Sequence, residues 1–144
     1  MIRVTIWNEY LHEKEEPVRH IYPKGIHEAI ADIYREESEF EVTAVSLDMP
    51  HQGLDTELLE RTDVLIWYGH MVHEQVEDDL VERIKRRVWD GMGLLILHSS
   101  DTVKSIRPCS GNNGRGAMER DRREGTGVGR EPQPSDCPGA EYVF

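Results

Sequence analysis

A short, uninterrupted apolar run at residues 93–97 constrains the fold of this chain more than any other feature. It follows an amphipathic segment almost directly and leads into a histidine, His98. Such a run, without polar alternation, is typical of a strand covered on both faces, as the strands of a parallel sheet are. The stretch therefore predicts an α/β domain in which this strand ends at an edge where polar side chains collect.

Three further strands are predicted upstream of this run. Residues 2–7, 40–47 and 63–68 are rich in β-branched or aromatic residues and are bounded by turn-forming segments. Between them, residues 24–37 are predicted to form a helix. Its apolar stripe at helical spacing consists of Ile26, Ile30, Ile33 and Tyr34.

Two more helices complete the alternation. A short one runs from an N-cap at Asp55 to Arg61. A longer one ends at Gly91, which is predicted to form a left-handed C-terminal cap. Its apolar stripe consists of Val76, Leu80, Val81, Ile84 and Val88. The strand–helix alternation, joined by right-handed crossovers, predicts a three-layer α/β domain with a flavodoxin-like parallel sheet in the order 2-1-3-4. Ligands then bind outside the carboxyl ends of the first, third and fourth strands.

The charge and composition exclude several classes of partner. A net charge of −11 argues against nucleic acid and anionic membranes. No apolar run reaches the length of a membrane span, and residues 1–20 carry charge where a signal peptide would be apolar, so a cytoplasmic protein is expected by default. The hydrophobic content of 38% is low and is concentrated in residues 1–100. We therefore expect one α/β domain at 1–100, followed by an irregular tail at 101–144.

Candidate functional residues collect at the carboxyl edge of the predicted sheet. Imidazoles there can act as acid or base near neutral pH or bind a divalent metal, and a carboxylate can orient them, act as a base or complete a metal site. The proposed acid–base group is His98, His70, Glu9 and His12. The proposed ligand-binding group is Trp7, Asn8, Gly69, His73 and Ser99, with Tyr68 and Ser100 beside them.

Simpler interpretations of these residues stay open. Tryptophans that end buried strands, Trp7 and Trp67, are expected to belong to the core. Gly69 serves either to permit a positive φ or to leave its N–H open to an oxyanion or a sugar hydroxyl. Ser99 lacks the G-x-S-x-G elbow of a nucleophilic serine. The remaining histidines are expected at the surface or hydrogen-bonded in the core: His20, His27 and His51.

Four stretches together resemble the ThuA-like (trehalose utilisation) family, a branch of the class I glutamine amidotransferase-like superfamily. They are I-R-V-T-I-W-N-E-Y-x-H-E-K at 2–14, I-Y-P-K-G-I-H at 21–27, D-V-L-I-W-Y-G-H-M-V-H at 63–73 and R-R-V-W-D-G-M-G-L-L-I-L-H-S at 86–99. The resemblance implies the superfamily fold and a role in the metabolism of trehalose or related disaccharides. It also implies that Gly69 matches the oxyanion position and that His98 falls near the nucleophilic cysteine. No cysteine stands there, which argues against thiolate chemistry.

From Asp101 the chain loses periodicity, and two interpretations of this tail are open. It is either a disordered tail or the product of a frameshift that leaves the domain incomplete. In a shifted frame, residues 125–140 can encode E-R-V-W-V-V-N-P-S-H-P-I-A-Q-G-L, which is similar to the family's N-P-x-H-P-I loop. In the other shifted frame, residues 101–106 can encode G-H-S-K-I, which resembles the family's continuation after the L-H-S strand. Both cysteines, Cys109 and Cys137, lie in this tail, where a disulfide between them is conceivable.

Three functions are consistent with these observations. The first is a carbohydrate-acting domain that uses rim histidines for acid–base chemistry. A variant is a metal site that uses some of His12, His70, His73 and His98. The second is a non-catalytic sugar-binding or regulatory module. The third is an inactive truncated product. Whether the protein is an enzyme, and whether it forms oligomers, is left open by the sequence.

Overall fold

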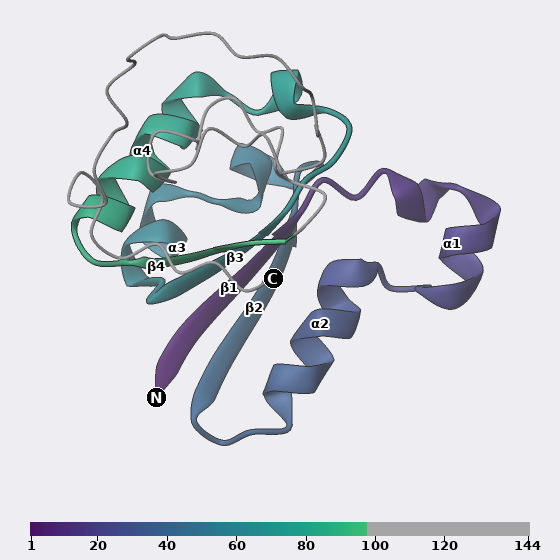
Figure 1. Ribbon diagram of the computed structural model, residues 1–144, viewed down its shortest axis with the longest axis horizontal. Coiled ribbons are helices and arrows are strands. Elements are labelled where there is room, and N and C mark those ends of the chain that lie inside the picture. Colours follow the sequence, from purple (N-terminus) through teal and green to yellow (C-terminus); the bar gives the residue numbers. More distant parts are fainter. Residues whose placement is uncertain (98–144) are drawn as a thin grey trace, which may run out of the picture.

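The computed structural model describes residues 1–97, and within them the strands form a single parallel sheet (Figure 1). Its strands are β1 (Ile2–Asn8), β2 (Phe40–Ser46), β3 (Val64–Tyr68) and β4 (Gly93–Ile96). Their order is β2-β1-β3-β4, and each neighbouring pair is parallel. The predicted flavodoxin-like arrangement is therefore confirmed. The predictions for His98, Ser99, Ser100 and the tail lie outside the described residues.

Helices cover both faces of this sheet (Figure 1). They are α1 (Glu16–Ile21), α2 (Ile26–Arg35), α3 (Thr56–Arg61) and α4 (Asp78–Trp89), with short 3-10 turns η1 (His12–Lys14), η2 (Pro50–Gly53) and η3 (His73–Gln75). The sequence did not predict α1. This helix buries none of its residues, so it has no apolar stripe to reveal it. None of the helices in residues 1–97 has the length and apolar character that crossing a membrane requires.

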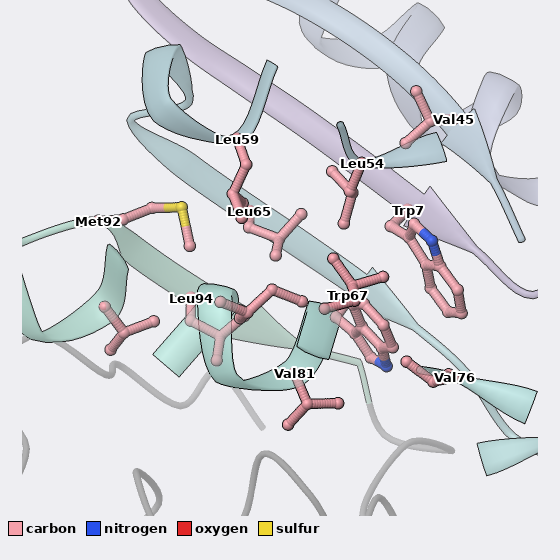
Figure 2. Close-up of a cluster of buried hydrophobic side chains, with 13 residues drawn as sticks. Trp7, Val45, Leu54, Leu59, Leu65, Trp67, Val76, Val81, Met92 and Leu94 are labelled. Carbon is pink, nitrogen blue, oxygen red and sulfur yellow. The ribbon is translucent and has the colours of Figure 1, made fainter. Parts of the chain in front are cut away.

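The two faces of the sheet carry separate cores, because successive residues of a strand point to opposite sides. Val4 and Ile6 of β1 pack with Ala31 of α2 on one face. Trp7 of β1 and Trp67 of β3 face the other side. Figure 2 shows them among side chains from α3, from α4 and from the segments that precede these helices, including Leu54, Leu59, Val76 and Val81. The larger core thus lies under α3 and α4.

The apolar stripe predicted for α2 is partly wrong. Ile33 is 68% exposed, whereas Ala31 and His27 are buried. The helix turns positions 27, 31 and 34 toward the sheet, a set that also has helical spacing. A small alanine and a histidine gave little apolar signal at these positions. Of the predicted stripe, Ile30 and Tyr34 pack against this core, and the prediction fails at Ile33.

Both predicted caps are present. The carboxylate of Asp55 accepts the N–H of Leu58 at 2.7 Å and begins α3. After α4, Gly91 has φ +105°, and its N–H donates to Val88 O while that of Met92 donates to Arg87 O. This pair of bonds is a Schellman motif, which occupies carbonyls at the end of the helix. Gly91 therefore turns the chain from α4 into β4.

Gly91→Ala should lower the free energy of unfolding by about 1–2 kcal/mol, because an L side chain resists a positive φ. A Cβ at this position would meet no atom within 4 Å, so the loss is conformational and not steric. Urea unfolding followed by circular dichroism measures it. Gly91→Asn is the control and should lose less, since asparagine tolerates the left-handed region better. An unchanged midpoint for Gly91→Ala would contradict the assignment.

An ion pair joins β1 to the start of β3 at the opposite, amino-terminal edge. Arg3 Nη2 lies 2.6 Å from Asp63 Oδ1, and Arg3 Nε donates to Oδ2 at 2.9 Å. The backbone N–H of Arg3 also donates to Oδ2 at 2.8 Å. These hydrogen bonds lower the pKa of Asp63 to about 2. Because both side chains are substantially exposed, the pair adds only modest stability.

The pH dependence of this contribution has a defined sign. The folded-state pKa of Asp63 lies below its ordinary value of 3.8, so the stabilisation is present above about pH 4 and is lost as the pH falls toward 2. Asp63→Asn should remove that part of the acid dependence. Urea midpoints measured from pH 5 to pH 2 test this. Equal slopes for the two proteins would refute it.

Candidate functional site

The carboxyl ends of the central strands lie level with one another. Asn8 at the end of β1 pairs with Ser46 of β2 and with Tyr68 of β3. Beyond β4, the N–H of Leu97 donates to Trp67 O at 3.0 Å. The loop after β1 (residues 9–25, here loop 1) and the loop after β3 (residues 69–77, here loop 3) therefore leave the sheet side by side. They carry the described part of the predicted site.

A buried carboxylate fastens these two loops together. Glu9 is only 2% exposed, and its Oε2 accepts the N–H of His70 at 2.8 Å and that of Met71 at 2.9 Å. The N–H of Val72 donates to the same oxygen at 3.3 Å, and Met71 also reaches Oε1 at 3.1 Å. Successive backbone N–H groups that converge on an anion form a nest, and hydrogen bonds to a charged acceptor are strong ones. Glu9 thus holds the start of loop 3.

Two of the predicted histidines meet on top of this anchor. The ring centroids of His12, from η1, and His70, from loop 3, lie 5.3 Å apart with an interplanar angle of 29°. His12 is half-buried and His70 is exposed. The rings come from segments 58 positions apart, and Glu9 holds the backbone N–H of His70. The structure therefore brings together three of the four residues predicted for acid–base work.

The tryptophans at the ends of β1 and β3 lie beneath the loops as part of the core. Trp7 and Trp67 stack with ring centroids 3.7 Å apart and are at most 1% exposed (Figure 2). Trp7 Nε1 donates to the carbonyl of Gln52 at 2.7 Å. Gln52 also contacts loop 3, through Gln75 O and the N–H of Glu77. Both rings thus support the loops from below, as expected of core residues.

Gly69 is buried, and its φ is not in the positive range. A Cβ at this position would lie 3.1 Å from Trp67 Nε1 and 3.4 Å from the ring of Trp7. Of the two uses predicted for Gly69, the positive φ is therefore wrong. The glycine instead allows the backbone to pass closely over the stacked tryptophans.

A second buried polar cluster lies beside loop 1 and includes two residues that the sequence did not assign to the site. Asn8, which is fully buried, donates from Nδ2 to Glu13 Oε1 at 2.6 Å and contacts His27 Nδ1 at 3.1 Å. Glu13 Oε1 also accepts the N–H of Ile26, the first residue of α2. Burial lowers the pKa of His27. Glu13 and His27 belong to the stretches that carried the family resemblance, which was the one signal available for them.

Tyr10 links this cluster to the rest of loop 1. Its φ is +54°, which is uncommon for a residue with a side chain, and its N–H donates to Asn8 Oδ1 at 3.0 Å. Its ring meets that of His27 edge to face, with centroids 5.4 Å apart. A strained backbone persists only where its surroundings hold it. Here Asn8 holds it, two residues before His12.

The other predicted residues are placed as follows. His73 is half-buried at the start of η3, and Tyr68 is half-buried at the end of β3. His20 is exposed on α1, and His51 is exposed on η2 with φ +55°. Within residues 1–97, no group of three or more histidine, cysteine, aspartate or glutamate side chains is arranged to hold a metal ion.

Comparison with protein families decides the family. The model of the ThuA family, described as trehalose utilisation, matches residues 3–114, well over half of the chain. The chain belongs to the ThuA family. The match to ThuA continues to residue 114, beyond residue 99, the last residue of the four stretches that carry the resemblance. A search of curated proteins found no match.

Glu9→Ala in this ThuA protein should destabilise the fold by about 3 kcal/mol, because it leaves buried N–H groups of loop 3 without their acceptor. Glu9→Gln keeps one carbonyl oxygen and should lose about half as much. Urea unfolding gives the loss, and amide hydrogen exchange should show reduced protection at residues 70–72. Glu74→Gln, an exposed acid in the same loop, is the control. Unchanged exchange at 70–72 in Glu9→Ala would contradict the role of Glu9 as the anchor.

Proposed function

We propose that this ThuA protein binds a carbohydrate at the carboxyl edge of its sheet and uses imidazoles of loops 1 and 3 for acid–base chemistry on it. The observation that carries the proposal is the ring contact between His12 and His70. Trehalose utilisation, the description of the family, supports a disaccharide or a closely related sugar as the ligand.

The pair suits this role because it combines a fixed backbone with accessible rings. Glu9 fixes the backbone N–H of His70, while the His70 side chain is exposed. One imidazole can donate a hydrogen bond to a sugar oxygen while its neighbour accepts one from a hydroxyl, since a neutral ring has one donor and one acceptor nitrogen. A neutral imidazole can also act as a general base that takes up a proton from a sugar hydroxyl.

A metal-dependent variant of this proposal uses some of the same imidazoles. His12, His70 and His73 are its candidate ligands in the described chain, and His98 is its candidate beyond it. A divalent metal would polarise a sugar oxygen or acidify a bound water. Glu9 would contribute to such a site by orienting loop 3 through its backbone hydrogen bonds.

A second function, a non-catalytic sugar-binding module, is favoured by one observation about Glu9. A general base needs a lone pair directed at the substrate. Both carboxylate oxygens of Glu9 instead accept backbone N–H groups, and the side chain is buried. The carboxylate is therefore occupied in holding loop 3, as a binding module would require. Under this alternative the imidazoles recognise hydroxyl groups and no bond is broken.

Calorimetric titration of the full chain with trehalose and with keto-sugars, run beside an activity screen, tests the proposal. His70→Gln and His12→Gln should each weaken sugar binding about tenfold, the equivalent of one lost hydrogen bond of about 1.4 kcal/mol. His20→Gln, an exposed histidine on α1, is the matched control and should bind normally.

The outcomes separate the alternatives. Turnover that disappears in His70→Gln supports acid–base chemistry, whereas binding without turnover supports the module. Turnover that disappears with chelator and returns with added metal supports the metal variant. Equal affinity of His70→Gln, His12→Gln and the unmodified protein for every sugar tested would refute the proposed site.

A further inference from the structure

The side-chain amide of Asn8 is oriented without ambiguity by its neighbours. Its Oδ1 accepts the N–H of Tyr10, which can only donate. Its Nδ2 lies 2.6 Å from a carboxylate oxygen of Glu13 and 3.1 Å from Nδ1 of His27. The two hydrogens of Nδ2 therefore point to Glu13 and to His27, and all hydrogen-bonding groups of the amide except one lone pair of Oδ1 are used.

This arrangement fixes the protonation state of His27. Because Asn8 Nδ2 donates, His27 Nδ1 must accept, so the ring proton resides on Nε2 and the ring is neutral. The side chain is only 4% exposed, and burial disfavours the charged form. A proton added at Nδ1 would point directly at the N–H of Asn8. The amide would then have to rotate so that Oδ1 accepts from His27.

Rotation of the amide would break two other hydrogen bonds. Oδ1 would leave the N–H of Tyr10, and Nδ2 would leave Glu13. Tyr10 holds a positive φ that needs such support, and the chain reaches His12 two residues later. Glu13 follows His12 directly and also binds the N–H of Ile26. Protonation of this buried imidazole would thus change the hydrogen bonds of the segment that carries His12.

We propose that His27 is a positioning residue of the site: through Asn8, its neutral ring holds loop 1 in the conformation that sets His12 against His70, and its protonation releases that conformation. In its consequence for ligand binding the inference rests on the proposed function. The conformational step itself does not, because Asn8, Tyr10 and His27 report it without any ligand.

Other charged groups act on the same ring, and their effects oppose burial. Glu28 on α2 itself, Glu13 from η1 and Asp48 after β2 each favour the protonated form. The Tyr10 ring contacts His27 edge to face, and Lys14 Nζ lies over the Tyr10 ring, 6.0 Å from its centroid. Glu13 Oε2 is buried and has no hydrogen-bond partner in the described structure. Burial outweighs the three carboxylates, and the pKa of His27 is lowered.

The direction of the pH dependence follows from this. A histidine whose folded-state pKa lies below its ordinary value of 6.5 stays neutral in the folded protein, while the unfolded chain takes up a proton first. Its contribution to stability is complete above about pH 6.5 and is lost as the pH falls toward the folded-state value. We therefore expect loop 1 to be released on the acid side of neutrality.

The test is an NMR titration of the isotope-labelled full chain from pH 8 to pH 5. The reporters are the backbone amide of Tyr10, the side-chain amide of Asn8 and the ring proton of His27. Two variants remove the titrating ring. His27→Asn places an amide oxygen near the position of Nδ1 and does not titrate, whereas His27→Leu removes the acceptor. His12→Gln and His70→Gln control for the titration of the site histidines themselves.

In the unmodified protein and in both control variants, the amide signals of Tyr10 and Asn8 should move together with the His27 ring proton. In His27→Asn they should stay at their high-pH positions throughout. In His27→Leu they should likewise show no pH-dependent movement, because no proton appears at this position to turn the Asn8 amide. If His27→Leu fails to fold, the comparison with His27→Asn decides alone. A Tyr10 amide that follows the same pH curve in His27→Asn, or stays still while His27 titrates, overturns the inference.

A trehalose titration at pH 7.5 and pH 5.5 then tests whether the protonation of His27 affects ligand binding. Binding by the unmodified protein should weaken about tenfold more between these pH values than binding by His27→Asn. An equal loss in both proteins would overturn the positioning role in binding. If no sugar binds at either pH, the proposed function fails, and the amide titration still decides on the conformational role of His27.

Discussion

The buried carboxylate of Glu9 is the interaction on which the described site depends. Burying a carboxylate is costly unless hydrogen bonds replace its hydration, and here the backbone N–H groups of residues 70–72 do so. If the two loops separated, the Glu9 carboxylate and the N–H groups of residues 70–72 would lose their hydrogen-bond partners. This is how a carboxylate directly after β1 holds the backbone of His70, although 61 positions separate the two in the chain.

A second interaction below the loops supports the first. The stacked rings of Trp7 and Trp67 fill the space between the ends of β1 and β3, and Gly69 crosses close to them because it has no side chain. Gln52 then links the loop after β2 to Trp7 and to loop 3. The packing of the core and the positions of the loops thus depend on the same contacts at this edge. A change in either tryptophan would reach the imidazoles through the backbone.

The fold was predictable because its signals are local and repeated. Apolar runs and stretches rich in β-branched residues predicted the strands, Asp55 and Gly91 predicted the helix ends, and right-handed crossovers left few strand orders to consider. The sequence failed to predict the features that lack such a local signal. The α1 helix buries nothing, so no periodicity marks it, and α2 buries an alanine and a histidine where Ile33 looked like the better core residue.

The sequence by itself predicted the parallel sheet and the edge where polar residues gather, because these depend on spacing along the chain, and its four matching stretches indicated the family. Only the tertiary structure decided what each polar residue does, because roles depend on neighbours distant in sequence. In the folded chain, Glu9 accepts backbone N–H groups of loop 3, and the rings of His12 and His70 lie in contact. The tertiary structure also joins Asn8, Glu13 and His27 in one buried network. Because these polar groups are buried, each needs a hydrogen-bond partner, and no local sequence pattern predicts which residue that partner is.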